Sequence, residues 1–470
     1  MELPVRFEER MRLLLGDEEW RQQAAVLSAP LTARGLRVNT LKITAQRLLP
    51  LLAVSATPVP FAVNGYVIEE ALKAGGDPLH HGGAYYMQEP SAMSAVTVLA
   101  PRPGERILDL CAAPGGKSTQ IAAAMQGEGL LWCNEYVPAR ARVLAQNLER
   151  CGVRNSVVSV GDTARLAQRL PDWFDGVLAD VPCSGEGMFR KEPEALAQWS
   201  EDNIALCATR GQEILHNAAQ CVRPGGRLVL STCTCAPEDN EWAVVRFLQT
   251  HPDFELVDSG VTFGCGGFDG EQIAPFGLSE ERQAACEVPL SRCRRLLPAH
   301  GGEGHFIALF RRQDTAGCAA VSLFSVGRET DGIKAARALY EDCFVQPPVG
   351  ILAEFGEMVR LLPREMPETN GITVLCAGVT VAQLRAGGRT LRAEPDHGVF
   401  QSARVEDCRR VLSLSLGDPR LTAFLRGEEV SADLSGGYTG VACEGVLTGY
   451  GKAANGRLKN HYPKGLRLVT

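Results

Sequence analysis

One stretch decides the fold of this chain: Leu108-Asp109-Leu110-Cys111-Ala112-Ala113-Pro114-Gly115-Gly116-Lys117. It follows a short apolar run and leads into a helical pattern over residues 117–125, which predicts a turn from a buried strand into a helix. Its two adjacent glycines let the backbone approach a ligand where a Cβ would clash. Neither the G-x-G-x-x-G of dinucleotide-binding folds nor a complete phosphate loop is present. The stretch therefore predicts a ligand-binding turn that does not cradle phosphates.

Short apolar runs alternate with helical patterns over residues 99–312. This alternation predicts a doubly wound α/β sheet with ligands at the carboxyl ends of its strands. Residues 1–98 form an expected N-terminal α+β region, residues 313–330 a linker, and residues 331–470 a C-terminal region rich in short strands. The expected strands are residues 106–110, 130–134, 156–160, 176–179, 227–231 and 305–310, with helices such as 139–151 and 203–222 between them.

Length and composition set the class of the protein. A chain of 470 residues is too long for one ordinary core, so two or three domains are expected. The hydrophobic content of 45% and charged content of 22% are typical of a soluble globular protein. At a net charge of −7, any binding to nucleic acid must use a local basic patch. No apolar run is long enough to span a bilayer, and the charged N-terminus lacks a signal-peptide core, so we expect a cytoplasmic protein without a membrane partner.

The sixteen cysteines are expected to be reduced thiols in such a protein. Most lie in apolar patterns typical of core residues. Cys233 and Cys235 form only a C-x-C, and no second pair or histidine cluster accompanies them. We therefore expect no metal site.

Acidic residues follow three of the predicted strands. Glu135 ends the second strand, where a carboxylate can hydrogen-bond both ribose hydroxyls of a nucleoside. Asp162 follows the third strand and could accept a hydrogen bond from an exocyclic amine, and Asp180 follows the fourth. Each acid alone could be a surface residue or a helix cap. Three in register at consecutive strand ends favour an adenosine-containing ligand.

Two cysteines follow predicted strands of the same sheet. Cys183 lies in Asp180-Val181-Pro182-Cys183, and Cys233 lies in Ser231-Thr232-Cys233-Thr234-Cys235. Pro182 restricts the backbone and stiffens the loop beneath Cys183. Either thiol alone could be a small core residue. Together with an acid and a nucleoside-binding loop at one sheet edge, they indicate covalent chemistry on a planar base.

These motifs resemble the RNA cytosine-5 methyltransferases of the RsmF-like branch of the Nol1/Nop2/Sun family. The resemblance covers nearly the whole chain and is weakest over residues 313–425. It implies a Rossmann-like S-adenosylmethionine (SAM) methyltransferase sheet and a C-terminal PUA-like, mostly β, RNA-binding domain. The motifs that carry it are residues 111–117, 180–191, 231–234 and 237–241, with 37–40 and 85–91 upstream and 302–308 and 451–465 downstream. Within the upstream motif, Ser91 is expected to cap a helix over residues 92–99.

Roles for individual residues follow from this resemblance. It implies that Cys233 is the nucleophile that adds to cytosine C6, that Cys183 assists the late step, and that Lys117 and Asp180 hold the base. Cys235 replaces a larger apolar residue and is a second candidate nucleophile, but Cys233 lies between the threonines. The role of His300 is left open. The implied SAM-binding residues are Cys111, Ala112, Ala113, Pro114, Gly115, Gly116, Lys117, Glu135, Asp162 and Asp180.

The last thirty residues carry five cations against one acid, Glu444, with His461 and Tyr462 among them. This composition fits either a solvated basic surface or RNA contacts, and the family resemblance favours RNA. Arg190 and Lys191 are expected near phosphates of the substrate. The expected partner is small-subunit (16S) rRNA, bound by a monomer. A tRNA substrate and an inactive RNA-binding or assembly factor remain as alternatives.

Overall fold

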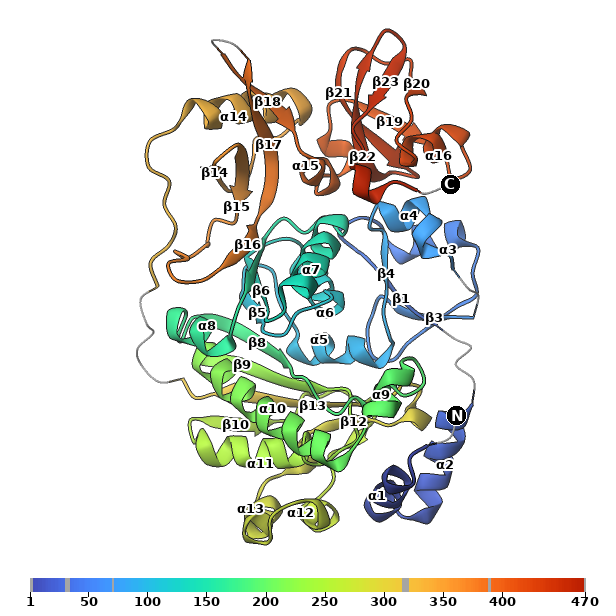
Figure 1. The fold of residues 1–470 in the computed structure, drawn as a ribbon, viewed down its shortest axis with the longest axis vertical. Coiled ribbons are helices and arrows are strands. Elements are labelled where there is room, and N and C mark those ends of the chain that lie inside the picture. The colour runs from blue at the N-terminus through green and yellow to red at the C-terminus, as the bar shows by residue number, and fades with distance from the viewer. Residues whose placement is uncertain (1–2, 30–33, 70–71, 315–320, 388–389, 469–470) are drawn as a thin grey trace.

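The computed structural model describes residues 3–29, 34–69, 72–314, 321–387 and 390–468. Its centre is a large sheet of ten strands, with the N-terminal segment at one side and two C-terminal sheets packed together at one end (Figure 1). Part of the predicted linker, residues 315–320, lies outside the described residues. No helix in the described ranges is long and apolar enough to cross a membrane.

All six predicted strands are present in the central sheet, which has the order β11-β12-β13-β9-β8-β5-β6-β7-β16, with β10 paired to β13. The strands from β9 to β7 are parallel, and β13 is antiparallel. The chain runs outward from β5 through β6 and β7, then crosses to β8. Since the direction of winding reverses there, a crevice opens between the carboxyl ends of β5 and β8. The bounds are β5 Arg106–Asp109, β6 Leu130–Glu135, β7 Ser156–Val160, β8 Phe174–Asp180, β9 Val222–Thr232, β10 Phe254–Val257, β11 Cys265–Gly266, β12 Arg294–Leu296 and β13 His305–Arg312.

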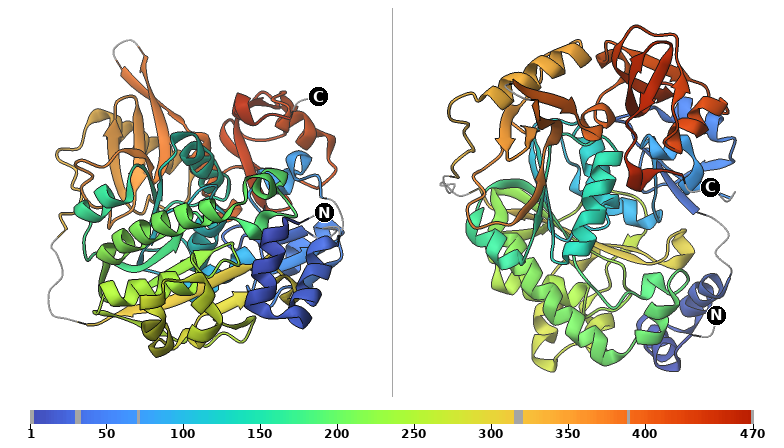
Figure 2. Two further views of the ribbon diagram at one scale, coloured as in Figure 1. Left: turned by 60° about the horizontal axis from the view of Figure 1, so that its bottom comes forward. Right: turned by 45° about the horizontal axis from the view of Figure 1, so that its top comes forward.

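The apolar runs of these strands are continuous because both faces of the sheet are covered. Successive residues point to opposite faces, so Trp132 belongs to one core cluster and Leu131 to the other. Helices α5 (Ser94–Leu99), α6 (Gly116–Ala124) and α7 (Pro138–Arg150) cover one face. Helices α8 (Thr163–Arg169), α10 (Glu201–Cys221) and α11 (Glu241–Thr250) cover the other, and the left view of Figure 2 shows α10 and α11 along it. The predicted doubly wound fold class is confirmed.

The N-terminal segment begins with two helices, α1 (Val5–Leu15) and α2 (Asp17–Ser28). They pack beside the central sheet through Phe7 and Trp20, against a cluster that includes Phe189 and Cys235. A four-stranded antiparallel sheet of order β2-β3-β1-β4 follows. Its elements are β1 Arg34–Val38, α3 Ala45–Leu52, β2 Ala56–Pro58, β3 Gly65–Ile68, α4 Pro78–His81 and β4 Tyr85–Met87.

The C-terminal region contains two further sheets and returns once to the central sheet. Strand β16 (Val374–Ala377) pairs antiparallel with β7 and extends the central sheet at its far edge. The five-stranded sheet at the C-terminus is the predicted PUA-like domain. The remaining bounds are α14 Asp331–Cys343, β14 Ile351–Phe355, β15 Met358–Leu362, β17 Val379–Gly387, β18 Thr390–Pro395, α15 His397–Gln401, β19 Val411–Leu414, α16 Pro419–Leu425, β20 Val430–Ser431, β21 Gly437–Cys443, β22 Val446–Ala454 and β23 Arg457–Asn460, with α9 Pro193–Gln198, α12 Gly270–Ile273 and α13 Arg282–Glu287 in the central part.

Candidate active site

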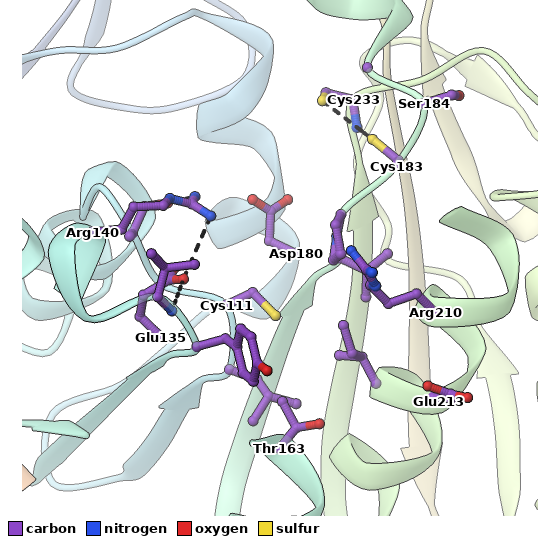
Figure 3. A pocket seen from close by; sticks show the side chains of 18 of the residues that line it. Cys111, Glu135, Arg140, Thr163, Asp180, Cys183, Ser184, Arg210, Glu213 and Cys233 are labelled. Carbon is purple, nitrogen blue, oxygen red and sulfur yellow. Dashed lines mark hydrogen bonds and ion pairs between the residues drawn. The ribbon is translucent and has the colours of Figure 1, made fainter. Parts of the chain in front are cut away.

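A cavity of about 1200 Å³ opens where the strand order reverses. Its walls come from the loops after β5, β6, β7, β8 and β9 and from helix α10, and Figure 3 shows the side chains that face it. The structure brings seven of the predicted site residues to this cavity: Cys111, Ala113, Glu135, Asp162, Asp180, Cys183 and Cys233. The other five predicted residues, Ala112, Pro114, Gly115, Gly116 and Lys117, are not part of its lining.

The loop after β5 is held from behind by the N-terminal segment. Gly115 has φ of 111°, a left-handed conformation that glycine adopts without strain, and α6 begins at the next residue. The buried guanidinium of Arg37, in β1, donates to the Gly116 carbonyl at 3.0 Å and to Thr119 Oγ1 at 2.7 Å. Burial lowers the pKa of Arg37 to about 10. Arg37 therefore positions the turn without contacting the cavity.

The acids at the ends of β6 and β7 also shape local backbone. Glu135 Oε1 accepts from the Val137 amide at 2.9 Å and lies 3.6 Å from Arg140, whereas its Oε2 makes no hydrogen bond within the described ranges. Asp162 Oδ1 accepts from the Ala164 amide at 2.7 Å, so Asp162 caps α8 while it lines the cavity. Asp162 therefore caps a helix, which was one alternative for these acids, and it also lines the cavity.

Lys117 and Asp180 form an ion pair beside the cavity. Lys117 Nζ lies 2.8 Å from Asp180 Oδ2. Burial disfavours the ammonium charge, but the attraction of Asp180 outweighs burial and raises the pKa of Lys117 above its ordinary value. Beneath this pair, Asp109 is fully buried, and burial raises the pKa of its carboxyl to about 7 although Ser118 donates to it.

The two cysteines predicted to act together are in contact. Cys183 Sγ lies 3.4 Å from Cys233 Sγ and accepts from the Cys233 amide at 3.3 Å. The hydrogen bond with Cys233 and burial raise the pKa of the Cys183 thiol well above its ordinary value. Cys235 points elsewhere: it is 5% exposed among residues of α1 and α2, and burial raises its pKa to about 12. Only Cys233 of this pair of candidates lines the cavity.

A second layer of polar residues fixes both cysteine loops, and reasoning from the strand ends alone did not find it. Glu186 accepts from Thr234 Oγ1 and from the Cys235 amide, both at 2.8 Å, and Asp239 accepts from the Ser184 hydroxyl at 3.1 Å. Farther back, the buried pair Arg295–Glu241 holds the Cys235 carbonyl through Arg295. The only sequence signal for Glu186, Asp239 and Glu241 was the family motifs at 180–191 and 237–241, and no motif included Arg295.

Three expectations about side chains are wrong. Ser91 does not cap its helix; Glu89 accepts from the Ser91 and Ala92 amides instead. Arg190 pairs with Glu303 at 3.2 Å and Lys191 Nζ is buried, so neither is presented to phosphates. Tyr462 is 2% exposed and hydrogen-bonds His81 at 2.7 Å, so it packs between domains and cannot stack on RNA. In each case burial redirects a side chain that looked exposed.

His300 lies outside the cavity lining. His300 Nδ1 accepts from the Leu297 amide at 3.1 Å within a short 3₁₀ turn, and His300 is not part of the lining. No group of three or more His, Cys, Asp or Glu side chains within the described ranges is arranged to hold a metal ion.

Three family models match the chain in succession. The N-terminal domain of 16S rRNA methyltransferase RsmF matches residues 3–90, 16S rRNA methyltransferase RsmB/F matches residues 96–311, and the methyltransferase RsmF PUA domain matches residues 411–468. Together the matched segments cover most of the chain.

Individual relatives agree with these matches. Ribosomal RNA small subunit methyltransferase F of Escherichia fergusonii is 42% identical over 230 residues, which cover 47% of this chain and 48% of that protein. The same protein of Erwinia tasmaniensis is 39% identical over 265 residues, which cover 54% of this chain and 55% of that protein. The chain spans about half the length of the curated relatives it matches.

Solved structures share the fold. A methyltransferase homolog protein from Pyrococcus horikoshii has a TM-score of 0.55 at 32% identity, covering 65% of this chain and 94% of that one. NSun6 from the same organism also has a TM-score of 0.55, at 21% identity, covering 66% of this chain and 98% of that one. Since the N-terminal, central and PUA segments match in order, this chain belongs to the RsmF-like branch of the Nol1/Nop2/Sun family.

Proposed function

We propose that this protein is a SAM-dependent RNA methyltransferase that methylates C5 of cytosine in small-subunit (16S) rRNA through a covalent bond between Cys233 and C6. The contact between Cys183 and Cys233, 3.4 Å apart at the cavity beside the Lys117–Asp180 pair, carries the proposal. Two thiols in contact have no use in the transfer of a methyl group to an amine or a hydroxyl. They suit the carbon of a pyrimidine ring, which must first be activated.

The cavity supports SAM as the methyl donor. Glu135 Oε2 is free to accept from ribose hydroxyls at the end of β6, and Val137, Val181 and Pro182 provide apolar wall for a flat base. SAM bound there supplies an electrophilic methyl group. The loop of residues 111–117 forms the floor of this part of the cavity through Cys111 and Ala113.

Activation of the cytosine needs a nucleophile and a stabilised negative charge. In the proposed reaction the Cys233 thiolate forms a bond to C6, and the C5–C6 π electrons make C5 nucleophilic. The negative charge that spreads to N3 is stabilised by the Lys117–Asp180 pair, which can donate a hydrogen bond or proton there. After C5 has gained the methyl group, its proton passes to a water molecule, the C5–C6 double bond re-forms and the Cys233 thiolate leaves. Cys183, which stays a thiol at neutral pH, assists this release through its contact with the Cys233 sulfur.

The substrate proposal draws on the RNA-binding segments. The base must leave its stack to reach Cys233, so the cavity would receive a flipped nucleotide. The PUA-like domain presents the exposed cations Lys452, Arg457 and Lys459 on β22 and β23, which suit contacts with the RNA backbone. Small-subunit rRNA is favoured because the matched family models and the names of the relatives refer to it.

The test is methyl transfer from radiolabelled SAM to unmodified 16S rRNA and to unmodified tRNA, followed by mapping of 5-methylcytosine. We expect label in 16S rRNA, at cytosine C5. Label in tRNA alone would overturn the substrate. Label in neither RNA, with the protein folded and SAM bound, would overturn the enzymatic proposal in favour of a binding or assembly factor.

A further inference from the structure

A buried chain of hydrogen bonds lies beside the candidate site and has no part in the mechanism above. It joins Glu89 and Ser91, just after β4, to His305 at the start of β13. Ser91 Oγ donates to Glu89 Oε2 at 2.6 Å and lies 2.7 Å from His305 Nδ1. The Glu303 amide also donates to Ser91 Oγ, at 3.3 Å.

This chain fixes which nitrogen of His305 carries the proton. Burial opposes the charge on Glu89, but the electrostatic influence of His305 and Lys191 and hydrogen bonds from Ser91 hold the pKa of Glu89 below its ordinary value. An ionised carboxylate only accepts hydrogen bonds, so the single Ser91 hydroxyl proton goes to Glu89. Ser91 Oγ must then accept from His305, which places the imidazole proton on Nδ1. Burial lowers the pKa of His305 to about 4, so the ring is neutral and Nε2 carries a lone pair.

The lone pair on Nε2 has no partner within the described ranges. His305 hydrogen-bonds Ser91 through Nδ1, on the other side of the ring. Nε2 is unpaired and not fully shut off from solvent, although His305 as a whole is only 6% exposed. The other polar side-chain atoms of this hydrogen-bonded chain each have a partner within the described ranges, whereas Nε2 has none.

His305 lies beside the proposed base-binding site, although it is not part of the lining of the cavity. Phe306, in β13, pairs with Thr232, in β9. Because the strands are antiparallel, the residues next to this pair are His305 at the start of β13 and Cys233 just after β9. The Gly187 amide donates to the Cys233 carbonyl at 2.9 Å, and a Cβ on Gly187 would lie 2.7 Å from the Gly304 carbonyl, so these backbones touch. The charges of Lys117 and Asp180 also reach His305, since both influence its pKa. His305 thus lies next to the loop that carries the nucleophile, and it feels the charges of the ion pair proposed to hold N3.

We propose that His305 distinguishes cytosine from uracil by accepting a hydrogen bond at Nε2 from the exocyclic 4-amino group of the target base. This inference rests on the proposed function. Cytosine presents an N4 donor at this edge, whereas uracil presents the O4 acceptor, and two lone pairs facing each other repel. The Nδ1–H tautomer, held by Ser91 and Glu89, cannot reverse its polarity as a freely rotating amide could. His305 would therefore be a specificity-determining residue that leaves the bond-forming steps to Cys233.

The test is a cycle of two changes, one in the protein and one in the RNA. Once the methylated cytidine has been mapped, two versions of a short 16S rRNA fragment are made, one with cytidine and one with pyrimidin-2-one ribonucleoside at that position. The second base lacks only the 4-amino group and can still react at C6. The rate of covalent adduct formation is measured for wild type and for His305→Phe, which keeps a ring of similar size but no acceptor.

If His305 Nε2 contacts the amine, each change alone lowers the rate of adduct formation by roughly 10–100-fold, and the two together cost little more than one. The ratio of cytidine to pyrimidinone reactivity is therefore much lower for His305→Phe than for wild type. Ser91→Ala, which frees the tautomer, should lower the same ratio in part. Independent, additive effects would overturn the inference, because residues that do not touch do not couple. The matched control is His300→Ala, whose ring hydrogen-bonds the Leu297 amide within its own turn and should leave the ratio unchanged. Failure of wild type to methylate any cytidine would instead refute the proposed function, so the two failures are distinguishable.

Discussion

Cys183 and Cys233 are 50 residues apart in sequence, yet their sulfur atoms lie 3.4 Å apart. The contact follows from the sheet: β8 and β9 are parallel neighbours, and Asp180 at the end of β8 pairs with Ser231 near the end of β9. Each cysteine follows its strand by a few residues, so the two loops leave the same edge side by side. A hydrogen bond from the Cys233 amide to the Cys183 sulfur fixes the relative position of the two loops.

Replacement of Cys183 and replacement of Cys233 should have different effects on the covalent bond to RNA. Cys183→Ala should form the bond to C6 but release it slowly, leaving protein joined to RNA, whereas Cys233→Ala should bind SAM without methylating RNA. A denaturing gel after incubation with SAM and 16S rRNA reports the joined species as a nuclease-sensitive shifted band. Cys286→Ala, at an exposed cysteine, is the control and should behave as wild type. An unshifted Cys183→Ala alongside active wild type would remove Cys183 from the release step.

The hydrogen bonds from Arg37, in β1, to the loop after β5 and the start of α6 should strengthen the binding of SAM. Arg37→Leu leaves the Gly116 carbonyl and the Thr119 hydroxyl without their buried donor. Loss of such contacts typically costs about 1–2 kcal/mol, so SAM should bind roughly tenfold more weakly in calorimetric titrations. Arg34→Leu, at an exposed position on the same strand, should not alter the Kd. Equal affinity of Arg37→Leu and wild type would show that the loop needs no support from β1.

Asp109 should make stability depend on pH. Its pKa of about 7 is raised from 3.8 in the unfolded chain, so the folded state holds a proton that the unfolded state loses between pH ~4 and ~7. The contribution of Asp109 to the free energy of unfolding is thus complete below pH ~4. It decreases as the pH rises and is absent above pH ~7. At 1.36 kcal/mol per unit the change is at most roughly 4 kcal/mol. Urea unfolding at pH 5 and pH 8 should show a smaller difference for Asp109→Asn than for wild type; identical differences would contradict the burial argument.

The Arg295–Glu241 pair is buried at 1% and 0% exposure of the two side chains. Arg295→Met should destabilise the fold by about 3–5 kcal/mol, because it leaves the Glu241 carboxylate buried and unpaired. The double variant Arg295→Met/Glu241→Gln should recover much of that loss, since no charge remains. Chemical denaturation measures both. If the double variant were no more stable than the single one, the cost would lie in lost packing of Arg295 against Phe268 and Phe306.

Substitutions on the basic face of the PUA-like domain should weaken RNA binding, whereas substitution of the buried Tyr462 should lower stability. The triple variant Lys452→Ala/Arg457→Ala/Lys459→Ala should bind 16S rRNA more weakly and with a shallower dependence on salt, as expected for lost phosphate contacts. Tyr462→Phe loses the hydrogen bond to His81, so it should lower stability by about 1 kcal/mol and leave RNA affinity unchanged. Filter binding over a range of salt, with thermal unfolding of each variant, tests both. Weaker RNA binding by Tyr462→Phe would mean that Tyr462 is not confined to the core.

The central sheet and the gathering of chemistry at one edge could be predicted from the sequence. Continuous apolar runs between helical patterns specify parallel strands covered on both faces, as Leu131 and Trp132 illustrate. Once the strands are parallel, residues that follow them meet at one edge whatever the loops do. That is why Glu135, Asp180, Cys183 and Cys233 could be expected together before any coordinates.

Only the tertiary structure decided which side chains face the cavity and what supports them. The loop of residues 111–117 exposes Cys111 and Ala113 but not Lys117, because Arg37 from another sheet fixes its turn. Cys235, two residues from Cys233, turns into the α1–α2 cluster. The Ser91–His305 contact spans 214 residues, and β16 joins the sheet from beyond the linker. Patterns along the chain encode strands and helices because these depend on neighbours in sequence; the direction of a loop side chain depends on what packs behind it, and that is set only when distant segments meet.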